Sequence, residues 1–132
     1  MIKSIFVNLP VANLAKSVEF FEALGFTFNA QFTSADSTCM IINDTIYAML
    51  LEHDRFAGFI DKPIASKETN EAILGFGLES ADEVRAMTSR ALELGAREIN
   101  PPQDLGFMFS WGFEDLDGHL WDLFYMNPDH VQ

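Results

Sequence analysis

Alternating apolar and polar positions predict a β-strand at two separate places in the chain, and each strand precedes a helical pattern. On one face of these two strands lie Ile5, Val7 and Leu9 in the first and Leu74, Phe76 and Leu78 in the second. One constant offset carries Leu9 onto Leu78 and Asn13 onto Asp82. We therefore predict an internal repeat rather than two unrelated strand–helix pairs.

Both helical patterns have recognisable ends. Asn13 is suited to cap the first helix, and Gly25 is suited to end it in a left-handed conformation. Ser80 and Glu83 have the spacing of a capping box, in which each side chain bonds the other's backbone amide at the start of the second helix. Gly95 ends that helix. The sequence predicts helices over about residues 14–24 and 81–94.

Three short strand candidates follow each helix. They cover residues 27–32, 39–42 and 46–51 in the first half, and residues 97–100, 107–113 and 119–126 in the second. Asp117 and Gly118 form the predicted turn of the last hairpin. The fold class expected is therefore α+β, with paired βαβββ modules. Module one spans about residues 1–54, a linker with a short helix near 55–60 spans about 55–71, and module two spans about 72–128.

Composition limits the classes of function. The 132 residues suit one domain, and a formal net charge of −12 argues against nucleic acid and anionic membrane surfaces as partners. The single cysteine, Cys39, excludes an internal disulfide and fits a reducing compartment and a small core residue. No run reaches the ~18 apolar residues of a membrane span, and "MIKSIFVNLPVANLAKS" lacks a signal-peptide pattern. We expect a cytoplasmic protein.

Four segments carry a family resemblance: "FVNLPVANLAKSVEFFEALGF", "LLEHDRFAGF", "LESADEVRAMTSRALELGA" and "FEDLDGHLWDLFYMNP". In this order they resemble the vicinal-oxygen-chelate superfamily of glyoxalase, extradiol dioxygenases, and bleomycin- and fosfomycin-resistance proteins. Within it, the chain is similar to the bacterial glyoxalase-like branch, predicted to be lactoylglutathione lyase-like. The resemblance implies paired βαβββ modules with sheets curled around a cavity, in a homodimer.

The resemblance also locates the metal ligands of the family, which come from the first and fourth strands of each module. These positions fall on Phe6, near Leu50, on Ile73 or Gly75, and on Asp122. Only Asp122 is a donor of the kind that divalent metals bind, although Glu52 and His53 follow shortly after Leu50. We expect the metal ligands to be largely lost and no cofactor to bind, with a divalent metal not excluded.

The acidic stretch near the end of the chain has two interpretations, a metal cluster or a turn. His119 and Asp122 are three residues apart in a predicted strand, so their side chains point to opposite faces. Asp115 and Asp117 flank the predicted turn, where aspartate bonds local backbone amides. The pattern favours turn chemistry for this cluster.

Asp122 is a separate case, because it shares a strand face with Leu120 and Phe124. A carboxylate on an apolar face must be paired, hydrogen-bonded or protonated. Asp122 is therefore either a catalytic base or lone metal ligand on a cavity floor, or a carboxylate paired with Asn8 or a backbone amide. Both alternatives remain open at this stage.

The remaining candidates for ligand binding line the predicted cavity: Phe6, Asn8, Glu52, Gly75, Gly77, Trp111 and Phe124. Glycines weaken a strand unless something approaches its backbone closely, which is why Gly75 and Gly77 are included. Trp111 alternates with Phe109 and Phe113, and this aromatic face either lines the pocket or belongs to the core. His130 lies in the tail and is expected to be solvated.

These observations predict a small-molecule-binding protein for an apolar or aromatic ligand, without the metal centre of the family. The alternative is a metal-dependent lyase, isomerase or dioxygenase that uses Asp122 with Glu52 or His53. A third possibility is an interaction module whose barrel is filled by Phe6 and Phe124.

Overall fold

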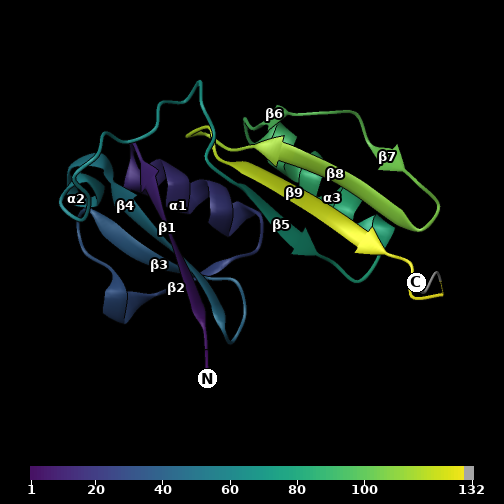
Figure 1. Cartoon of the computed structure of the whole chain (residues 1–132), viewed down its shortest axis with the longest axis horizontal. Helices are drawn as coiled ribbons and strands as arrows, with labels where there is room; N and C mark the ends of the chain where they lie inside the picture. The colour runs from purple at the N-terminus through teal and green to yellow at the C-terminus, as the bar shows by residue number, and fades with distance from the viewer. Residues whose placement is uncertain (130–132) are drawn as a thin grey trace. The chain divides into compact units, whose positions relative to one another are not determined.

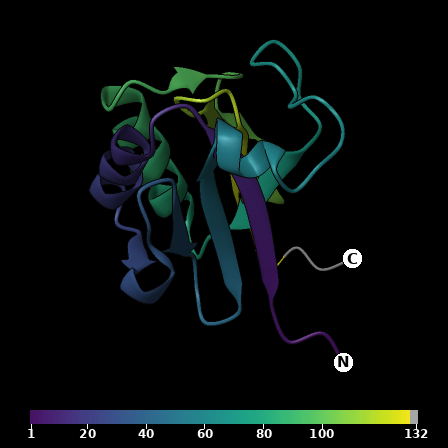
Figure 2. The ribbon, with the colours of Figure 1, turned by 90° about the vertical axis from the view of Figure 1, so that its left-hand side faces the viewer.

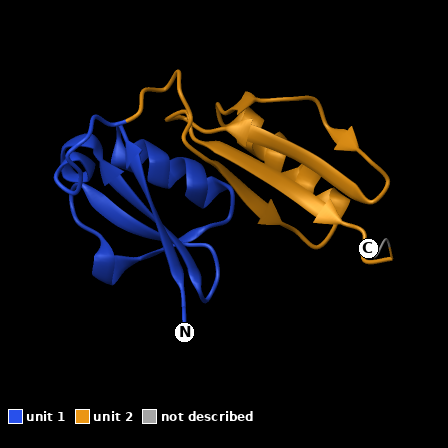
Figure 3. Ribbon diagram, in the orientation of Figure 1, with its two compact units in different colours: residues 1–64 blue, residues 65–132 orange. Residues whose placement is uncertain are grey.

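The computed structural model describes residues 1–129, so the prediction for His130 lies outside the described part. The chain divides into two compact units, residues 1–64 and 65–132 (Figure 3). The division falls inside the segment predicted to be a linker, and residues 65–71 belong to the second unit. No helix in the described range is long and apolar enough to cross a membrane.

The first unit is a four-stranded mixed sheet, called sheet 1, with α1 on one face (Figures 1 and 2). Its strand order is β1-β4-β3-β2; β1 runs parallel to β4, and the other neighbours are antiparallel. Its elements are β1 (Ile5–Val11), α1 (Leu14–Ala23), β2 (Thr27–Asn29), the 3-10 turn η1 (Ala30–Phe32), β3 (Ser37–Ile41), β4 (Ile46–Glu52) and α2 (His53–Ala57).

The second unit repeats this topology as sheet 2, with the order β5-β9-β8-β6 and β7 added against β8 (Figure 1). Strand β5 is parallel to β9, as β1 is to β4. The elements are β5 (Ile73–Gly77), α3 (Ala81–Glu93), β6 (Arg97–Glu98), β7 (Gln103–Asp104), β8 (Met108–Glu114) and β9 (Leu120–Met126). The α+β prediction of paired βαβββ modules is confirmed.

Helix α1 begins and ends as its sequence predicts. The side chain of Asn13 accepts a hydrogen bond from the Lys16 amide, and Gly25 adopts a φ of 106° directly after the helix end. The helix buries Leu14, Ser17, Phe20 and Phe21, and it packs against β4. Val18, between these positions, is only half-buried.

Helix α3 shows a correction to the predicted capping box. Ser80 accepts from the Glu83 amide, as expected, but the Glu83 carboxylate accepts from the amide of Glu79 rather than from Ser80 (2.8 Å). The helix buries Val84, Thr88 and Ala91 against sheet 2. The core of the second unit is completed by strand residues that are at most 5% exposed: Phe109, Phe113, Trp121 and Leu123.

Several helices and strands begin or end at other residues than predicted. The strand expected over residues 27–32 ends at Asn29, because its side chain accepts from the Gln31 amide and starts η1 (2.9 Å). Helix α2 begins at His53, directly after β4, instead of near residue 55, and the 97–100 strand shortens to two residues. Strand β7 was not predicted, because its two polar residues carry no alternating pattern.

Candidate functional site

The predicted site residues of the second unit, except for Trp111, lie on one face of sheet 2. Helix α3 covers the opposite face, where Thr88 donates to the carbonyl of Trp111 (2.9 Å). We call the face turned away from α3 the far face. On the three long strands it consists, by register, of Ile73, Gly75, Gly77, Met108, Ser110, Gly112, Glu114, Leu120, Asp122, Phe124 and Met126.

Asp122 occupies the middle of the far face with a glycine on each side. Strand β5 places Gly75 opposite it, and β8 places Gly112 opposite it. No hydrogen bond or ion pair joins the Asp122 carboxylate to the described residues of this unit. Burial raises the pKa of this half-buried carboxyl group above its ordinary value, and nothing nearby offsets the cost of burying its charge.

Glu114 lies on the same face but, unlike Asp122, has a charged partner. Its carboxylate bonds the guanidinium of Arg97 at 2.6 Å, and Arg97 is its register partner on β6. The hydrogen bond and the charge of Glu114 raise the pKa of Arg97. The fold therefore supplies a cation to one carboxylate of the far face and none to the other.

Gly75 and Gly77, the two glycines predicted to line the cavity, lie against a side chain of this protein. A Cβ at Gly75 would lie 3.5 Å from the ring of Phe124, and a Cβ at Gly77 would lie 3.4 Å from it. The ring that approaches this backbone closely therefore comes from Phe124. Gly112 is glycine for a different reason, because a Cβ there would collide with the Trp121 carbonyl oxygen.

Two of the predicted site residues of the first unit, Phe6 and Asn8, lie on β1. Phe6 stacks on Tyr47, its register partner on β4, with ring centroids 4.6 Å apart. The Tyr47 hydroxyl donates to the carbonyl of Asp44 (2.7 Å), which fixes that ring. The side-chain amide of Asn8 donates to the Phe6 carbonyl (3.3 Å). The first-unit candidates thus form an aromatic pair with a neighbouring amide.

Glu52 has a structural partner. Its carboxylate accepts a hydrogen bond from the backbone amide of Leu14 at 2.9 Å, so the last residue of β4 caps α1. By register it shares a face with Leu50 and Val11, which are buried, and not with Phe6. His53 is exposed as the first residue of α2. The ligand role for Glu52 stays a prediction, with the carboxylate already engaged.

The acidic turn between β8 and β9 is organised by Asp115. One carboxylate oxygen accepts from the amides of Asp117 (2.9 Å) and His119 (3.0 Å), and the other accepts from the indole nitrogen of Trp121 (2.8 Å). Gly118 has a φ of 91°, and its amide donates to the Asp115 carbonyl. The predicted turn chemistry is confirmed for Asp115.

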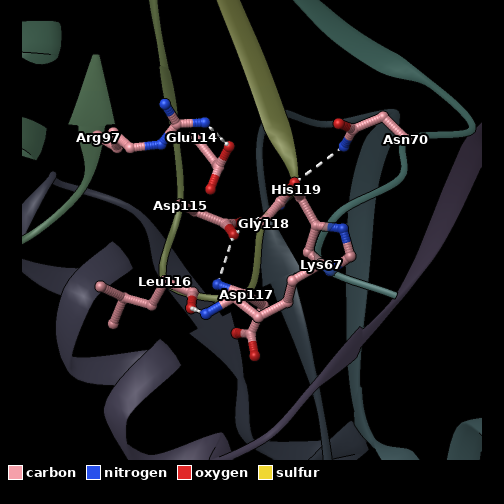
Figure 4. Close-up of polar contacts among 9 residues, drawn as sticks. All are labelled: Lys67, Asn70, Arg97, Glu114, Asp115, Leu116, Asp117, Gly118 and His119. Atoms are coloured by element: carbon pink, nitrogen blue, oxygen red, sulfur yellow. Dashed lines mark hydrogen bonds and ion pairs between the residues drawn. The ribbon is translucent and has the colours of Figure 1, made fainter. Parts of the chain in front are cut away.

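A preceding loop is fastened to this turn (Figure 4). The ammonium group of Lys67 donates to the carbonyl of Leu116 at 3.1 Å, and the side-chain amide of Asn70 donates to the carbonyl of Gly118 at 2.9 Å. Both bonds satisfy carbonyl oxygens that the turn leaves unpaired. The start of the second unit is therefore tied to its last hairpin.

Comparisons with known proteins agree with this geometry. The family described as bleomycin resistance protein-like N-terminal matches residues 3–43. A hypothetical protein, SA1046 from S. aureus, is similar with 27% identity and a TM-score of 0.81, covering 95% of each chain. A glyoxalase/bleomycin resistance protein/dioxygenase family enzyme from Burkholderia phytofirmans PsJN is 14% identical, with a TM-score of 0.76 over 92% of this chain and 96% of that one. The fosfomycin resistance protein FosX from Listeria monocytogenes is 21% identical, with a TM-score of 0.72 over 98% of each chain.

The chain therefore has the glyoxalase/bleomycin-resistance fold. No curated protein matches it in sequence.

The internal repeat corrects one of the superfamily ligand positions. The offset that relates the modules carries Phe6 onto Gly75, and these residues pair with Tyr47 and Asp122 on the fourth strands. The position equivalent to Asp122 is therefore Tyr47, and not a residue near Leu50, which lies on the other face of β4. The four positions are now Phe6, Tyr47, Gly75 and Asp122.

This donor set does not fit a divalent ion. It offers one carboxylate and one phenol, and the phenol is engaged with the Asp44 carbonyl. Nowhere in residues 1–129 do three histidine, cysteine, aspartate or glutamate side chains come together as a metal site. Within the part of the chain that the structure describes, these positions hold too few donors for a metal centre of the superfamily type.

Trp111 lies on the α3 side of sheet 2, opposite the far face. Its indole nitrogen donates to the Glu98 carboxylate (2.8 Å), and its neighbours Phe109 and Phe113 are buried, with Arg85 over the ring of Phe109. Trp111 is thus on the other side of the sheet from Asp122. Its predicted role in ligand binding remains untested.

Three neighbours of the predicted site residues were not predicted: Tyr47 in the first unit, and Ser110 and Gly112 in the second. Gly112 was detectable as a third glycine inside a strand pattern, like Gly75 and Gly77. Tyr47 and Ser110 gave no signal, because only the strand register shows which residues they face.

Proposed function

We propose that this vicinal-oxygen-chelate protein binds a small apolar or aromatic molecule on the far face of sheet 2 and does so without a divalent metal. The observation that carries the proposal is the lone carboxylate of Asp122, which lies between Gly75 and Gly112 beside the ring of Phe124. Small-molecule sites are lined mostly by apolar side chains, with a small number of polar groups that fix the orientation of the ligand. Asp122 is the anchor, and Phe124 is the apolar contact.

The two register partners of Asp122 add no side chain beside its carboxylate. Gly75 and Gly112 are both glycines, and the ring of Phe124 lies against Gly75. Ser110 adds a hydroxyl on the next far-face position of β8. A ligand would satisfy a carboxylate that the second unit leaves without a partner.

Binding after chelation tests the proposal. Purified protein is treated exhaustively with EDTA, and a library of aromatic fragments is screened by ligand-observed NMR. We expect hits that persist in EDTA and weaken in Phe124→Leu. The control is Phe32→Leu, which removes an exposed ring of the first unit that is in no proposed site. Hits that disappear on chelation would contradict binding without a metal.

A second candidate is a metal-dependent lyase, isomerase or dioxygenase. It is favoured by the position of Asp122, which falls where the superfamily has a metal-binding glutamate. Two observations count against it: the Glu52 carboxylate is already bonded to the Leu14 amide, and His53 is exposed. The test is elemental analysis after incubation with zinc, nickel, manganese or ferrous ions and desalting. About one retained ion per chain, lost in Asp122→Ala, would favour this enzyme over the binding protein.

A further inference from the structure

We infer that the molecule bound on the far face carries a positively charged nitrogen, as a primary or quaternary ammonium group, next to an aromatic or apolar part. This inference rests on the proposed function and specifies its ligand. The nitrogen pairs with the carboxylate of Asp122, and the apolar part lies beside Phe124.

The first argument is charge. A half-buried carboxylate needs a cation or hydrogen-bond donors, because removing its charge from water is costly. On the three long strands of sheet 2, the far face carries no lysine, arginine or histidine. Glu114 is paired with the cation Arg97 on β6. Strand β6 pairs with β8 only at Glu114 and Phe113, so it does not reach Gly112, the neighbour of Asp122. No described residue of this unit therefore pairs with the charge of Asp122, and a cationic ligand would supply the partner.

The second argument is size and shape. A metal ion requires several donors that converge on one point, and of the two far-face carboxylates Glu114 is already paired with Arg97, which leaves only that of Asp122. An organic ammonium group needs only one carboxylate and an aromatic or apolar wall. Gly75 and Gly112 place no side chain beside Asp122, and the ring of Phe124, which lies against Gly75, supplies the aromatic wall. These features match an organic cation better than a metal ion.

The third argument is the field of the whole chain. Twenty acidic residues against eight basic ones give the net charge of −12. Such a field attracts cations toward the protein and repels anions. A carboxylate or phosphate ligand would meet both this field and the charge of Asp122, so an anionic ligand is disfavoured.

Three probes that share one ring system test the charge directly. They are 1-naphthylmethylamine, which is cationic at pH 7, the neutral 1-naphthalenemethanol, and the anionic 1-naphthoate. Binding to the full chain is measured by NMR titration at 0.15 M salt. We expect the amine to bind about tenfold more tightly than the alcohol, as a charge-assisted hydrogen bond would give, and the naphthoate to bind most weakly.

Two variants that lose the same charge separate Asp122 from general attraction. Asp122→Asn should bring the affinity of the amine down to that of the alcohol, while the affinity of the alcohol stays within about twofold of wild type. Asp82→Asn, on the first turn of α3 and thus on the covered side of the same unit, should leave the preference for the amine intact. An equal loss in both variants would overturn the inference, because the preference would then come from net charge.

The outcomes also separate this inference from the proposed function. Suppose that the alcohol or the naphthoate binds as tightly as the amine, and that Phe124→Leu weakens the binding of that probe and of the amine. The far face then binds ligands, but the inference about charge is wrong. If none of the probes binds and the fragment screen gives no hit, the proposed function fails together with the inference. Chemical-shift changes of Gly75 and Gly112 amides report whether binding occurs on the far face.

Discussion

At the scale of single residues, two aspartates with raised pKa values behave differently. Burial is the largest cause of the raised pKa in both. Asp115 recovers part of the cost through three N–H donors and the nearby charge of His119, all of which lower its pKa. Asp122 has no such compensation within its unit. A carboxylate kept without a partner at a cost in stability is typical of a functional position.

Asp122→Asn should not destabilise the protein at pH 7.5, and a gain of less than about 1 kcal/mol in the free energy of unfolding is expected. The raised folded-state pKa means that the wild type binds its proton more tightly when folded. Its stability therefore falls as the pH rises from 3.8 through the raised value. The advantage of the variant should shrink as the pH is lowered.

Urea unfolding of both proteins in a series from pH 7.5 to pH 4 measures this difference. A loss of more than about 1 kcal/mol in the variant at pH 7.5 would show that the wild-type carboxylate has a strong partner.

Asp115→Asn should lower the free energy of unfolding by about 1–3 kcal/mol, because the new NH₂ group faces the indole N–H of Trp121. Trp121→Phe removes that N–H, so the double variant should lose less than the sum of the two single variants. Asp104→Asn is the matched control, since Asp104 accepts only the Gly106 amide at an exposed turn. Additive losses would contradict a direct Asp115–Trp121 bond.

At the scale of elements, strand register determines what each predicted site residue faces. Glu52 is the last residue of β4, and its side chain lies on the face that α1 covers. Tyr47, on the same strand, lies on the opposite face together with Phe6. Strand β8 brings Gly112 beside Asp122, although they are ten positions apart in a hairpin. The helix caps, in contrast, depend on residues close in sequence, and both were predicted from Asn13 and Ser80.

Glu52→Ala should lower the free energy of unfolding by about 0.5–2 kcal/mol, the usual loss for a helix cap. Glu52→Gln keeps an oxygen that can accept from Leu14 and should lose less. Thermal and urea unfolding measure both. Neither variant should change the affinity of a far-face ligand, and a clear loss of affinity in Glu52→Gln would restore its predicted role in binding.

At the scale of the whole molecule, two copies of one βαβββ topology carry different chemistry at equivalent positions. The first unit has an aromatic pair, Phe6 and Tyr47, where the second has Gly75 and Asp122. The two units thus share the strand order of their sheets but differ in the residues at these equivalent positions. The similarity to FosX and to glyoxalase-type structures concerns this shared architecture.

The resemblance to the superfamily predicts a homodimer, and a cytoplasmic location is predicted from composition. Light scattering coupled to size exclusion should give twice the mass of one chain at micromolar concentration. Dilution to nanomolar concentration serves as the control, since a dimer held by mass action dissociates on dilution. The mass of a single chain at all concentrations would contradict the prediction.

The amino-acid sequence specifies what depends on neighbours along the chain. The repeat, the helix ends, the Asp117-Gly118 turn and the presence of one carboxylate on an apolar strand face were all readable, because strand alternation, helix period and turn chemistry act over a few residues. Pairings between distant segments were not readable, because register arises from packing of the whole unit. These pairings engaged Glu52 with α1, put Phe124 on the two glycines, gave Glu114 a cation and left Asp122 without one.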